Sequence, residues 1–271
     1  MSYVLKGKLI AVGGAESRDH IEQEKLEVLG RILHEMRGKD TVLEIIPTAS
    51  GIPKQIAREY TDAFGSLGCK AARVMNIRKR KDAEKKEFLE RIRTCDGIMF
   101  SGGNQTRLSE IFLETEFLSI LKERLATEPG FVIAGTSAGA MAQSAHMING
   151  GAPSEALIRG KALMIEGLGF IENAIIDSHF VNRGRFGRLM VAVAEHPEMT
   201  GIGISEDTAV IITENRFMEI IGTGLVVIMD GSALGINTIA EQTGEMLNLE
   251  HMIFHLLSKG KRYDILNRKV V

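Results

Sequence analysis

Apolar runs alternate with amphipathic segments through the first half of the chain, and this alternation restricts the fold more than any other feature. Five apolar runs are typical of buried strands, at residues 8–12, 41–46, 72–77, 97–100 and 131–134. Segments with helical spacing of apolar residues lie between them, at residues 21–36, 53–67, 82–93 and 105–126. Repeated strand–helix–strand units require a parallel sheet with helices on both faces. Right-handed crossovers place the carboxyl ends of such strands on one edge, where ligands bind.

The second half of the chain has a different pattern. Two apolar stretches, at residues 207–212 and 217–221, are separated by a polar break, which is typical of a β-hairpin. We expect these strands to extend the sheet in the antiparallel sense. No internal repeat or linker separates the halves. The sequence therefore predicts one α/β domain over residues 1–271, with a doubly wound, mostly parallel sheet and a C-terminal antiparallel extension.

Composition and charge narrow the class of protein. The chain has 271 residues, of which 44% are hydrophobic, as in globular proteins that bury a sizeable core. Its formal net charge of −2 argues against nucleic acid and anionic membranes as partners. The first residues lack a secretory pattern, and no apolar run approaches the ~18 residues of a membrane span. We therefore expect a cytoplasmic protein.

The motif Gly-Thr-Ser-Ala-Gly at residues 135–139 directly follows the fifth apolar run. A serine at a sharp strand-to-helix turn projects its hydroxyl above the sheet, and small residues two positions away let strand and helix pack closely. The helix that begins there presents free backbone N–H groups, so the amide of Ala138 is a candidate oxyanion donor. The pattern favours Ser137 as a nucleophile over a glycine-rich turn that holds a buried serine.

A serine nucleophile needs a base and an orienting acid. His179 is the candidate base among seven histidines, because an apolar strand leads into a polar end at this point. The alternative is a histidine satisfied by local hydrogen bonds. The candidate acid belongs to the pair Glu206-Asp207, which lies at the junction of two apolar stretches where an uncompensated carboxylate would be costly to bury. Solvated acids at a hairpin entry are the alternative there. The order serine, histidine, acid differs from that of the α/β-hydrolases.

Four separated motifs occur in order within the stretch from residue 8 to residue 231. They are Gly102-Gly103-Asn104-Gln105, the elbow at 135–140, Asp177-Ser178-His179-Phe180 followed by Arg183-Gly184-Arg185, and Ser205-Glu206-Asp207-Thr208-Ala209. Together they resemble the cyanophycinases, serine exopeptidases that belong with the aspartyl dipeptidases. The chain departs from the expected family pattern at Ser178, where we would expect a glutamine before the histidine.

The resemblance implies a flavodoxin-like sheet similar to that of class I glutamine amidotransferases. It places the nucleophile on Ser137, the base on His179 and the acid on Glu206, with no cofactor. It implies cleavage of cyanophycin, a poly-aspartate backbone with arginines amide-linked to its side chains, into β-Asp-Arg dipeptides. Backbone amides of Ala138 and of Gly103 or Asn104 would receive the oxyanion.

An arginine cluster follows the expected base. Guanidinium groups bind carboxylates bidentately, and the polymer carries free carboxylates on its arginines and at its terminus. A solvated helix face is the alternative for this cluster. Asp177 is a candidate to hold a substrate guanidinium. The expected substrate-binding residues are Gln105, Asp177, Ser178, Arg183, Arg185 and Arg188.

Other functions share parts of this pattern. An α-aspartyl dipeptidase, or another β-aspartyl peptide hydrolase, would use the same triad, but the arginine cluster and the length after Gly231 favour the polymer. A noncatalytic amidotransferase-like module is disfavoured, because that chemistry uses a cysteine at the elbow. His251 and His255 have the spacing of one helical face but lack a third ligand, so we predict no metal. The oligomeric state stays open, with a homodimer as one alternative.

Overall fold

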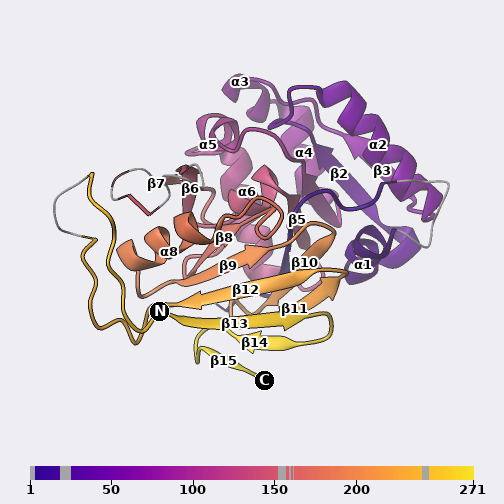
Figure 1. The fold of residues 1–271 in the computed structure, drawn as a ribbon. Helices are drawn as coiled ribbons and strands as arrows, with labels where there is room; N and C mark the ends of the chain where they lie inside the picture. The colour runs from indigo at the N-terminus through magenta and orange to yellow at the C-terminus, as the bar shows by residue number, and fades with distance from the viewer. Residues whose placement is uncertain (1–3, 19–25, 152–156, 159, 161, 240–243) are drawn as a thin grey trace.

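The computed structural model describes residues 4–18, 26–151, 157–158, 160, 162–239 and 244–271, and most of its strands lie in two sheets (Figure 1). The larger sheet has nine strands in the order β15-β14-β11-β10-β1-β5-β4-β2-β3. The smaller sheet has four strands in the order β13-β12-β9-β8. A separate hairpin pairs β6 (His146–Gly150) with β7 (Ala162–Glu166).

Parallel strands form one half of the larger sheet, as the alternating sequence pattern predicts. They are β1 (Lys8–Val12), β2 (Val42–Ile46), β3 (Ala71–Val74), β4 (Gly97–Phe100) and β5 (Val132–Thr136). Leu9 and Ala11 of β1 belong to the core on one face, whereas Ile10 and Val12 belong to the core on the other. This alternation buries both faces, which confirms the predicted doubly wound α/β architecture.

Helices cover both faces of the parallel strands. On one face lie α1 (Glu27–Glu35) and α2 (Pro53–Ser66), and on the other α4 (Lys86–Thr94), α5 (Thr106–Phe112) and α6 (Glu116–Thr127). Two shorter helical segments, the 3₁₀ turn η2 (Gly38–Asp40) and α3 (Arg80–Ala83), lie in the connections.

The helix boundaries differ from the predicted ones in three places. The helix predicted over 82–93 is divided between α3 and α4. The helix predicted over 105–126 is interrupted because Glu114 takes a φ of 57° and the Thr115 hydroxyl accepts the Leu118 amide at 3.3 Å, which begins α6. The helix predicted from residue 21 begins at Glu27, and residues 19–25 lie outside the described part of the chain.

Antiparallel strands extend the larger sheet from β1, which confirms the predicted hairpin and its position. They are β10 (Thr208–Thr213), β11 (Phe217–Gly222), β14 (Arg262–Asp264) and β15 (Lys269–Val270). β10 pairs with β1, so that Lys8 lies opposite Thr213 and Val12 opposite Ala209. The sheet is therefore parallel on one side of β1 and antiparallel on the other.

The smaller sheet was not anticipated from the sequence. It contains β8 (Ala174–Asp177), β9 (Thr200–Ile204), β12 (Leu225–Asp230) and β13 (Ile253–Ser258). One face packs against α8 (Phe186–Glu195), and the other shares a core with the antiparallel half of the larger sheet. His255 lies in strand β13, so the helical arrangement expected for His251 and His255 is wrong.

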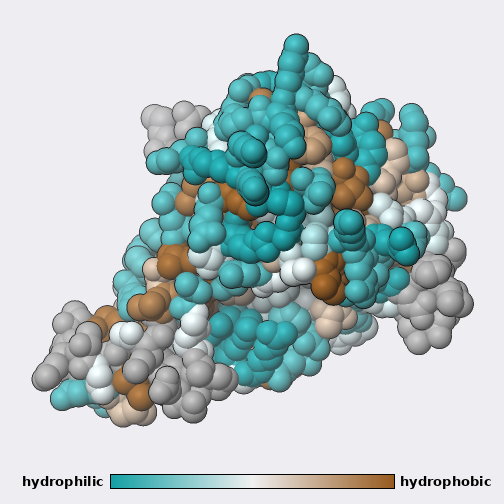
Figure 2. Space-filling view, turned by 90° about the horizontal axis from the view of Figure 1, so that it is seen from above, coloured by the Kyte–Doolittle hydropathy of each residue, from teal (hydrophilic) through white to brown (hydrophobic). Residues whose placement is uncertain are grey.

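The helices α2, α3 and α5 lie along the upper part of the molecule in Figure 1. Figure 2, turned to view the molecule from above, shows a mostly hydrophilic face on which hydrophobic residues form separate small patches. In the described part of the chain, no helix has the length and apolar character needed to cross a membrane.

Candidate active site

The elbow joins β5 to the short helix α7 (Ala138–Met141) at the carboxyl edge of the parallel strands. Ser137 adopts φ 51° and ψ −111°, a conformation that costs a non-glycine residue about 1–3 kcal/mol. A Cβ at Gly135 would overlap the carbonyl oxygen of Gly139, so only glycine fits where strand and helix meet. The predicted strand–turn–helix arrangement is present, with the serine at its apex.

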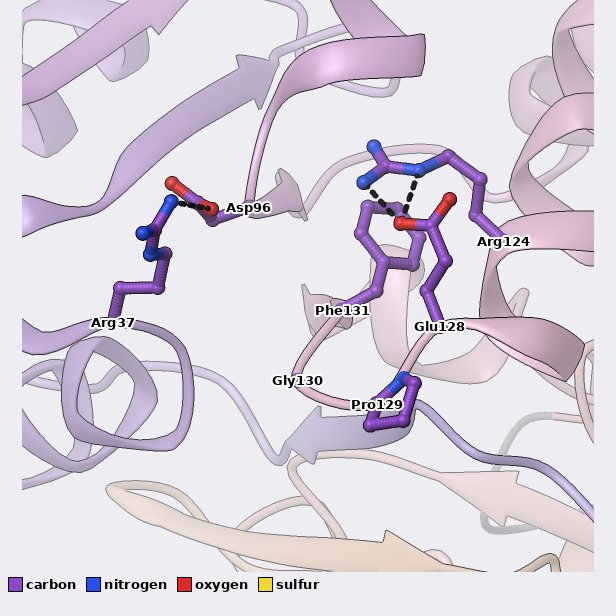
Figure 3. Close-up of a pocket in the computed structure, with 7 residues that line it drawn as sticks. All are labelled: Arg37, Asp96, Arg124, Glu128, Pro129, Gly130 and Phe131. Atoms are coloured by element: carbon purple, nitrogen blue, oxygen red, sulfur yellow. Dashed lines mark hydrogen bonds and ion pairs between the residues drawn. The ribbon is translucent and has the colours of Figure 1, made fainter.

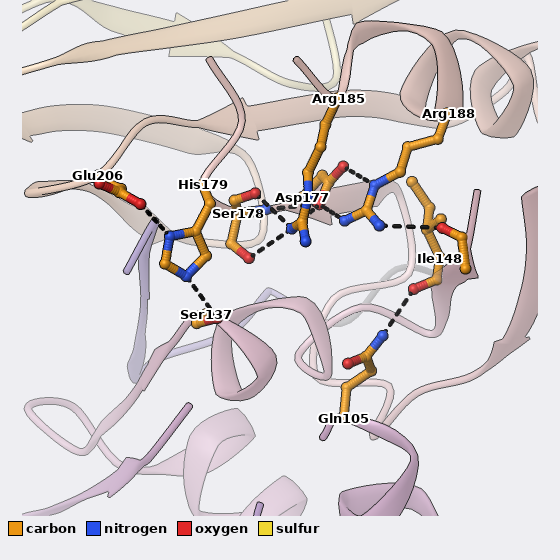
Figure 4. Close-up of polar contacts among 10 residues, drawn as sticks. Gln105, Ser137, Ile148, Asp177, Ser178, His179, Arg185, Arg188 and Glu206 are labelled. Carbon is orange, nitrogen blue, oxygen red and sulfur yellow. Dashed lines mark hydrogen bonds and ion pairs between the residues drawn. The ribbon is translucent and has the colours of Figure 1, made fainter. Parts of the chain in front are cut away.

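The structure brings Ser137, His179 and Glu206 together, although they are far apart in the sequence. His179 Nε2 lies 3.0 Å from Ser137 Oγ, and His179 Nδ1 lies 2.6 Å from Glu206 Oε1 (Figure 4). His179 follows β8 and Glu206 follows β9, and these two strands are parallel neighbours. This serine–histidine–carboxylate chain has the geometry for proton transfer from a serine hydroxyl.

Burial and nearby charges favour the neutral form of His179. Burial is the largest influence that lowers the pKa of this imidazole below its usual value near 6.5, and the guanidinium groups of Arg183 and Arg185 add to it. The hydrogen bond that His179 donates to the Glu206 carboxylate opposes this lowering of the pKa but does not cancel it. A neutral imidazole can accept the hydroxyl proton of Ser137 near neutral pH.

Among the backbone amides around Ser137 that have no acceptor within the described residues, two are the expected oxyanion donors. They belong to Ala138, at the start of α7, and to Gly103, in the turn after β4. The Gly102–Gly103 turn packs directly on the nucleophile, because a Cβ at Gly102 would lie 3.2 Å from Ser137 Cβ. The amide of Asn104 donates to the Ala49 carbonyl at 3.0 Å. Of the two expected alternatives, the geometry therefore favours Gly103 over Asn104 as the second oxyanion donor.

A pocket of about 300 Å³ opens at the serine and the histidine. Its lining includes Glu16, Arg18, Gly103, Ser137, His179 and Arg183. Glu16 and Arg18 were missed in the sequence analysis, although they follow the glycine turn at the carboxyl end of β1, on the same sheet edge as the elbow. Arg183 is exposed and lines this pocket, and it has no ion-pair partner among the residues that the structure describes.

Arg188 and Arg185 have a different environment from Arg183. Arg188 is buried, and its Nε lies 2.7 Å from Asp177 Oδ2 while its Nη2 contacts Oδ1 (Figure 4). It also donates to the Gly150 carbonyl at 3.1 Å. Arg185 donates to Asp177 Oδ1 at 3.3 Å. Asp177 thus holds two guanidinium groups of its own chain. This differs from the expectation that all three arginines face substrate carboxylates and that Asp177 holds a substrate guanidinium.

Arg185 is less exposed than Arg183 but more exposed than Arg188. Its guanidinium donates to the Ser178 carbonyl at 2.8 Å. Burial is the largest influence on its pKa, which falls to about 10 with help from Arg188 and Arg183 and against the attraction of Asp177. Ser178 is fully buried, and its hydroxyl lies 3.5 Å from Arg185 Nη1. On the far side of the elbow, Gln105 Nε2 donates to the Ile148 carbonyl at 3.2 Å (Figure 4). Substrate contacts of Gln105, Ser178 and Arg185 stay predictions.

A second pocket, of about 280 Å³, lies at the opposite edge of the parallel strands (Figure 3). Its charged side chains neutralise one another, because Arg37 pairs with Asp96 at 3.5 Å and Arg124 pairs with Glu128 at 2.6 Å. The Arg124 guanidinium also lies 4.0 Å from the Phe131 ring centroid. Among the described residues, no group of three or more histidine, cysteine or acidic side chains is arranged to hold a metal ion.

Comparison with known proteins shows the family to which this chain is similar. The profile of peptidase family S51 matches residues 9–220. A cyanophycinase from Geminocystis herdmanii is 36% identical over 97% of this chain and 96% of its own length. A cyanophycinase from Trichormus variabilis is 34% identical over 98% of this chain and 88% of its own length. The crystal structure of a peptidase from an acI-B1 Actinobacterium has the same fold, with a TM-score of 0.70 at 22% identity over 97% of this chain and 98% of that chain.

Proposed function

The chain belongs to peptidase family S51, a family of serine-type peptidases, and we propose that it is an exopeptidase that hydrolyses cyanophycin to β-Asp-Arg dipeptides. One observation carries the proposal: Ser137, His179 and Glu206 form a hydrogen-bonded chain beside a pocket that Arg183 also lines. The names of the curated relatives support the polymer as substrate, since the similarity extends over nearly the whole chain.

In the first proposed step, Ser137 Oγ attacks the carbonyl carbon of the scissile peptide bond. His179 Nε2 takes the hydroxyl proton, and Glu206 stabilises the imidazolium that results. The carbonyl oxygen becomes an oxyanion and accepts hydrogen bonds from the amides of Gly103 and Ala138. Removing one donor of this kind typically costs 10²–10³-fold in kcat, roughly 3–4 kcal/mol.

The tetrahedral intermediate then collapses and the peptide C–N bond breaks. His179 gives its proton to the leaving amine, which departs and leaves an acyl group on Ser137. Water repeats the sequence in the second half-reaction: His179 removes its proton, the hydroxide oxygen bonds to the acyl carbon, and Ser137 Oγ leaves with the proton. No cofactor is required in this scheme.

Substrate recognition follows from the charges of the pocket. Each repeating unit of cyanophycin carries a free carboxylate on its arginine, and Arg183 is placed to bind such a group through its planar guanidinium. Arg18 also lines the pocket, but its guanidinium pairs with Glu59 at 3.6 Å and lies 5.2 Å from the centroid of the Tyr60 ring. Arg185 and Arg188 contribute indirectly in this proposal, because Asp177 already holds them beside the base.

The proposal is tested by incubating the protein with insoluble cyanophycin and analysing the soluble products by mass spectrometry. We expect β-Asp-Arg dipeptides, and their absence with the Ser137→Ala variant. Release of free aspartate from α-aspartyl dipeptides, with the polymer left intact, would instead identify an aspartyl dipeptidase.

A further inference from the structure

The backbone amides of the catalytic segments converge on one stretch of chain. The carbonyl oxygens of Val12, Gly13 and Gly14 accept hydrogen bonds from the amides of Ser137, His179 and Asp207, at 2.9, 2.7 and 2.9 Å respectively. Three consecutive carbonyls at the end of β1 thus hold the candidate nucleophile, the candidate base and the residue that follows the candidate acid.

All three held residues have unfavourable backbone conformations. Their φ angles are 51° at Ser137, 47° at His179 and 48° at Asp207, in the left-handed region that side chains other than glycine rarely adopt. Such conformations persist only where the surroundings over-determine them. Each of the three residues is held in the same way, because its amide nitrogen donates to a carbonyl of residues 12–14.

The side chain of Glu16 anchors this stretch, which we name the β1 loop (residues 12–16). Glu16 is buried, with 3% of its surface exposed. Its Oε2 accepts the Thr136 hydroxyl at 2.7 Å, and its Oε1 accepts the hydroxyl of Tyr60, which is fully buried in α2. Thr136 is the residue immediately before the nucleophile. The carboxylate therefore ties the β1 loop to the elbow and to α2.

The β1 loop packs closely against the candidate base and beside the candidate acid. Gly14 has a φ of 99°, and a Cβ there would overlap the His179 ring. A Cβ at Gly13 would overlap the Ser205 carbonyl oxygen, beside the acid. A shift of the β1 loop would consequently displace the base and the acid relative to the serine.

We propose that Glu16 is a positioning residue: by bonding Thr136 and Tyr60, it fixes the β1 loop as the common support on which the nucleophile, base and acid are aligned. The inference rests on the proposed roles of Ser137, His179 and Glu206. Glu16 itself does not touch the reacting atoms. Loss of the anchor disturbs alignment, which lowers kcat, more than it disturbs substrate binding, which sets KM.

Thr136→Val tests this inference with little change in shape, because valine keeps the branched side chain and removes the hydroxyl that Glu16 accepts. A misplacement of about 1 Å can cost 10²-fold in rate, so we expect kcat on soluble cyanophycin chains to fall roughly ten- to a hundredfold with KM nearly unchanged. Glu16→Gln should behave similarly. Thr136→Ser keeps the hydroxyl and should recover most of the parent rate.

Thr41→Val is the matched control. Thr41 is also fully buried, and its hydroxyl accepts one hydrogen bond, from the Arg37 amide at 3.1 Å. It precedes β2, at the opposite end of the strands from the elbow. We expect a comparable loss of thermal stability in this variant but an unchanged kcat. Equal losses of kcat in the two variants would overturn the proposal, because stability alone would then explain them.

Two further readouts keep the test decisive. The rate at which a fluorophosphonate labels Ser137 should fall in Thr136→Val and not in Thr41→Val, and this measurement applies even if the parent releases no dipeptide from cyanophycin. The downfield NMR signal of the His179 Nδ1 proton should move or broaden in Thr136→Val alone. Parent values of kcat, labelling rate and NMR signal in both Thr136→Val and Glu16→Gln would refute the role of Glu16. A raised KM with parent kcat would assign Glu16 to substrate binding instead.

Discussion

The parallel half of the larger sheet and the smaller sheet contribute to the candidate site in different ways. The parallel half supplies Ser137 and the candidate oxyanion amides of Gly103 and Ala138 through short turns that follow β4 and β5. The smaller sheet supplies His179 and Glu206 from the ends of β8 and β9. The sequence pattern did not predict that these strands form a second sheet.

One region therefore contributes the candidate nucleophile, and the other contributes the candidate base and acid. The nucleophile turn is defined locally, by glycines that fit a tight strand-to-helix connection. The candidate base and acid depend on contacts between the regions in our proposal, since the His179 and Asp207 amides donate to carbonyls of the β1 loop. The comparison predicts that the rate of peptide hydrolysis depends on residues of both regions together. Substitutions in one region alone can change stability or substrate specificity.

The largest expected effect comes from removing one triad member in each region. Ser137→Ala and His179→Ala should each lower kcat by about 10⁴-fold or more, as in other disabled triads. The double variant should be little worse than either single one, because the two side chains act as a unit. Steady-state kinetics on soluble cyanophycin chains measure this. Multiplicative losses in the double variant would show that the regions act independently.

The acid is tested within the same comparison. Glu206→Gln should lose most activity, while Asp207→Asn should retain it, because Asp207 Oδ2 accepts the Thr223 hydroxyl at 2.8 Å rather than a bond from His179. The reverse outcome would move the acid role to Asp207.

The second effect is on stability and is confined to the smaller sheet and its helix. Arg188→Ala leaves the buried carboxylate of Asp177 with one weaker guanidinium contact, so we expect about 3–5 kcal/mol of destabilisation, the range for breaking a buried ion pair. Urea unfolding measures it. Arg183→Ala is the matched control, because an exposed arginine without an ion-pair partner among the described residues should change stability by less than about 0.5 kcal/mol. Equal effects would contradict the assignment of different roles.

The third effect is on specificity. Arg183→Ala should lower kcat/KM for cyanophycin about ten- to a hundredfold, since a charge-assisted hydrogen bond contributes roughly 1.5–3 kcal/mol. Lysine at this position should recover only part of the loss, because it lacks the planar fork. Labelling of Ser137 by a fluorophosphonate should be unaffected. An Arg183→Ala enzyme that degrades the polymer at the parent rate would remove this residue from the substrate site.

The smallest expected effect is on pH dependence. Because the pKa of His179 is lowered, kcat/KM should stay high as pH falls to the usual histidine value near 6.5, and should decline only below it, as the imidazole gains a proton. Arg183 lowers this pKa, so Arg183→Ala should move the acidic limb to higher pH, and Arg183→Lys should restore it. Movement to lower pH would contradict the electrostatic account.

The sequence by itself determined the parallel sheet and the nucleophile turn. Alternating apolar and amphipathic segments leave few ways to bury both faces of a strand. The tight turn after β5 requires glycine at 135, where a Cβ would overlap the Gly139 carbonyl, and at 139, where a Cβ would overlap the Phe100 carbonyl. The antiparallel hairpin was equally local, since 208–213 and 217–222 pair through a short turn. His179 and Glu206 were selected from their positions after apolar runs and from the family resemblance, and not from any pattern that linked them to each other.

Only the tertiary structure decided which charges are free and which are used inside the protein. The spacing of Arg183, Arg185 and Arg188 is the same whether they face solvent, substrate or Asp177, and β8 and α8 together place Asp177 against Arg188. Glu16 likewise gave no signal, because its partners Tyr60 and Thr136 lie 44 and 120 residues away. Local sequence restricts backbone conformation, whereas the partner of a charged side chain depends on which distant segments the packed core brings beside it.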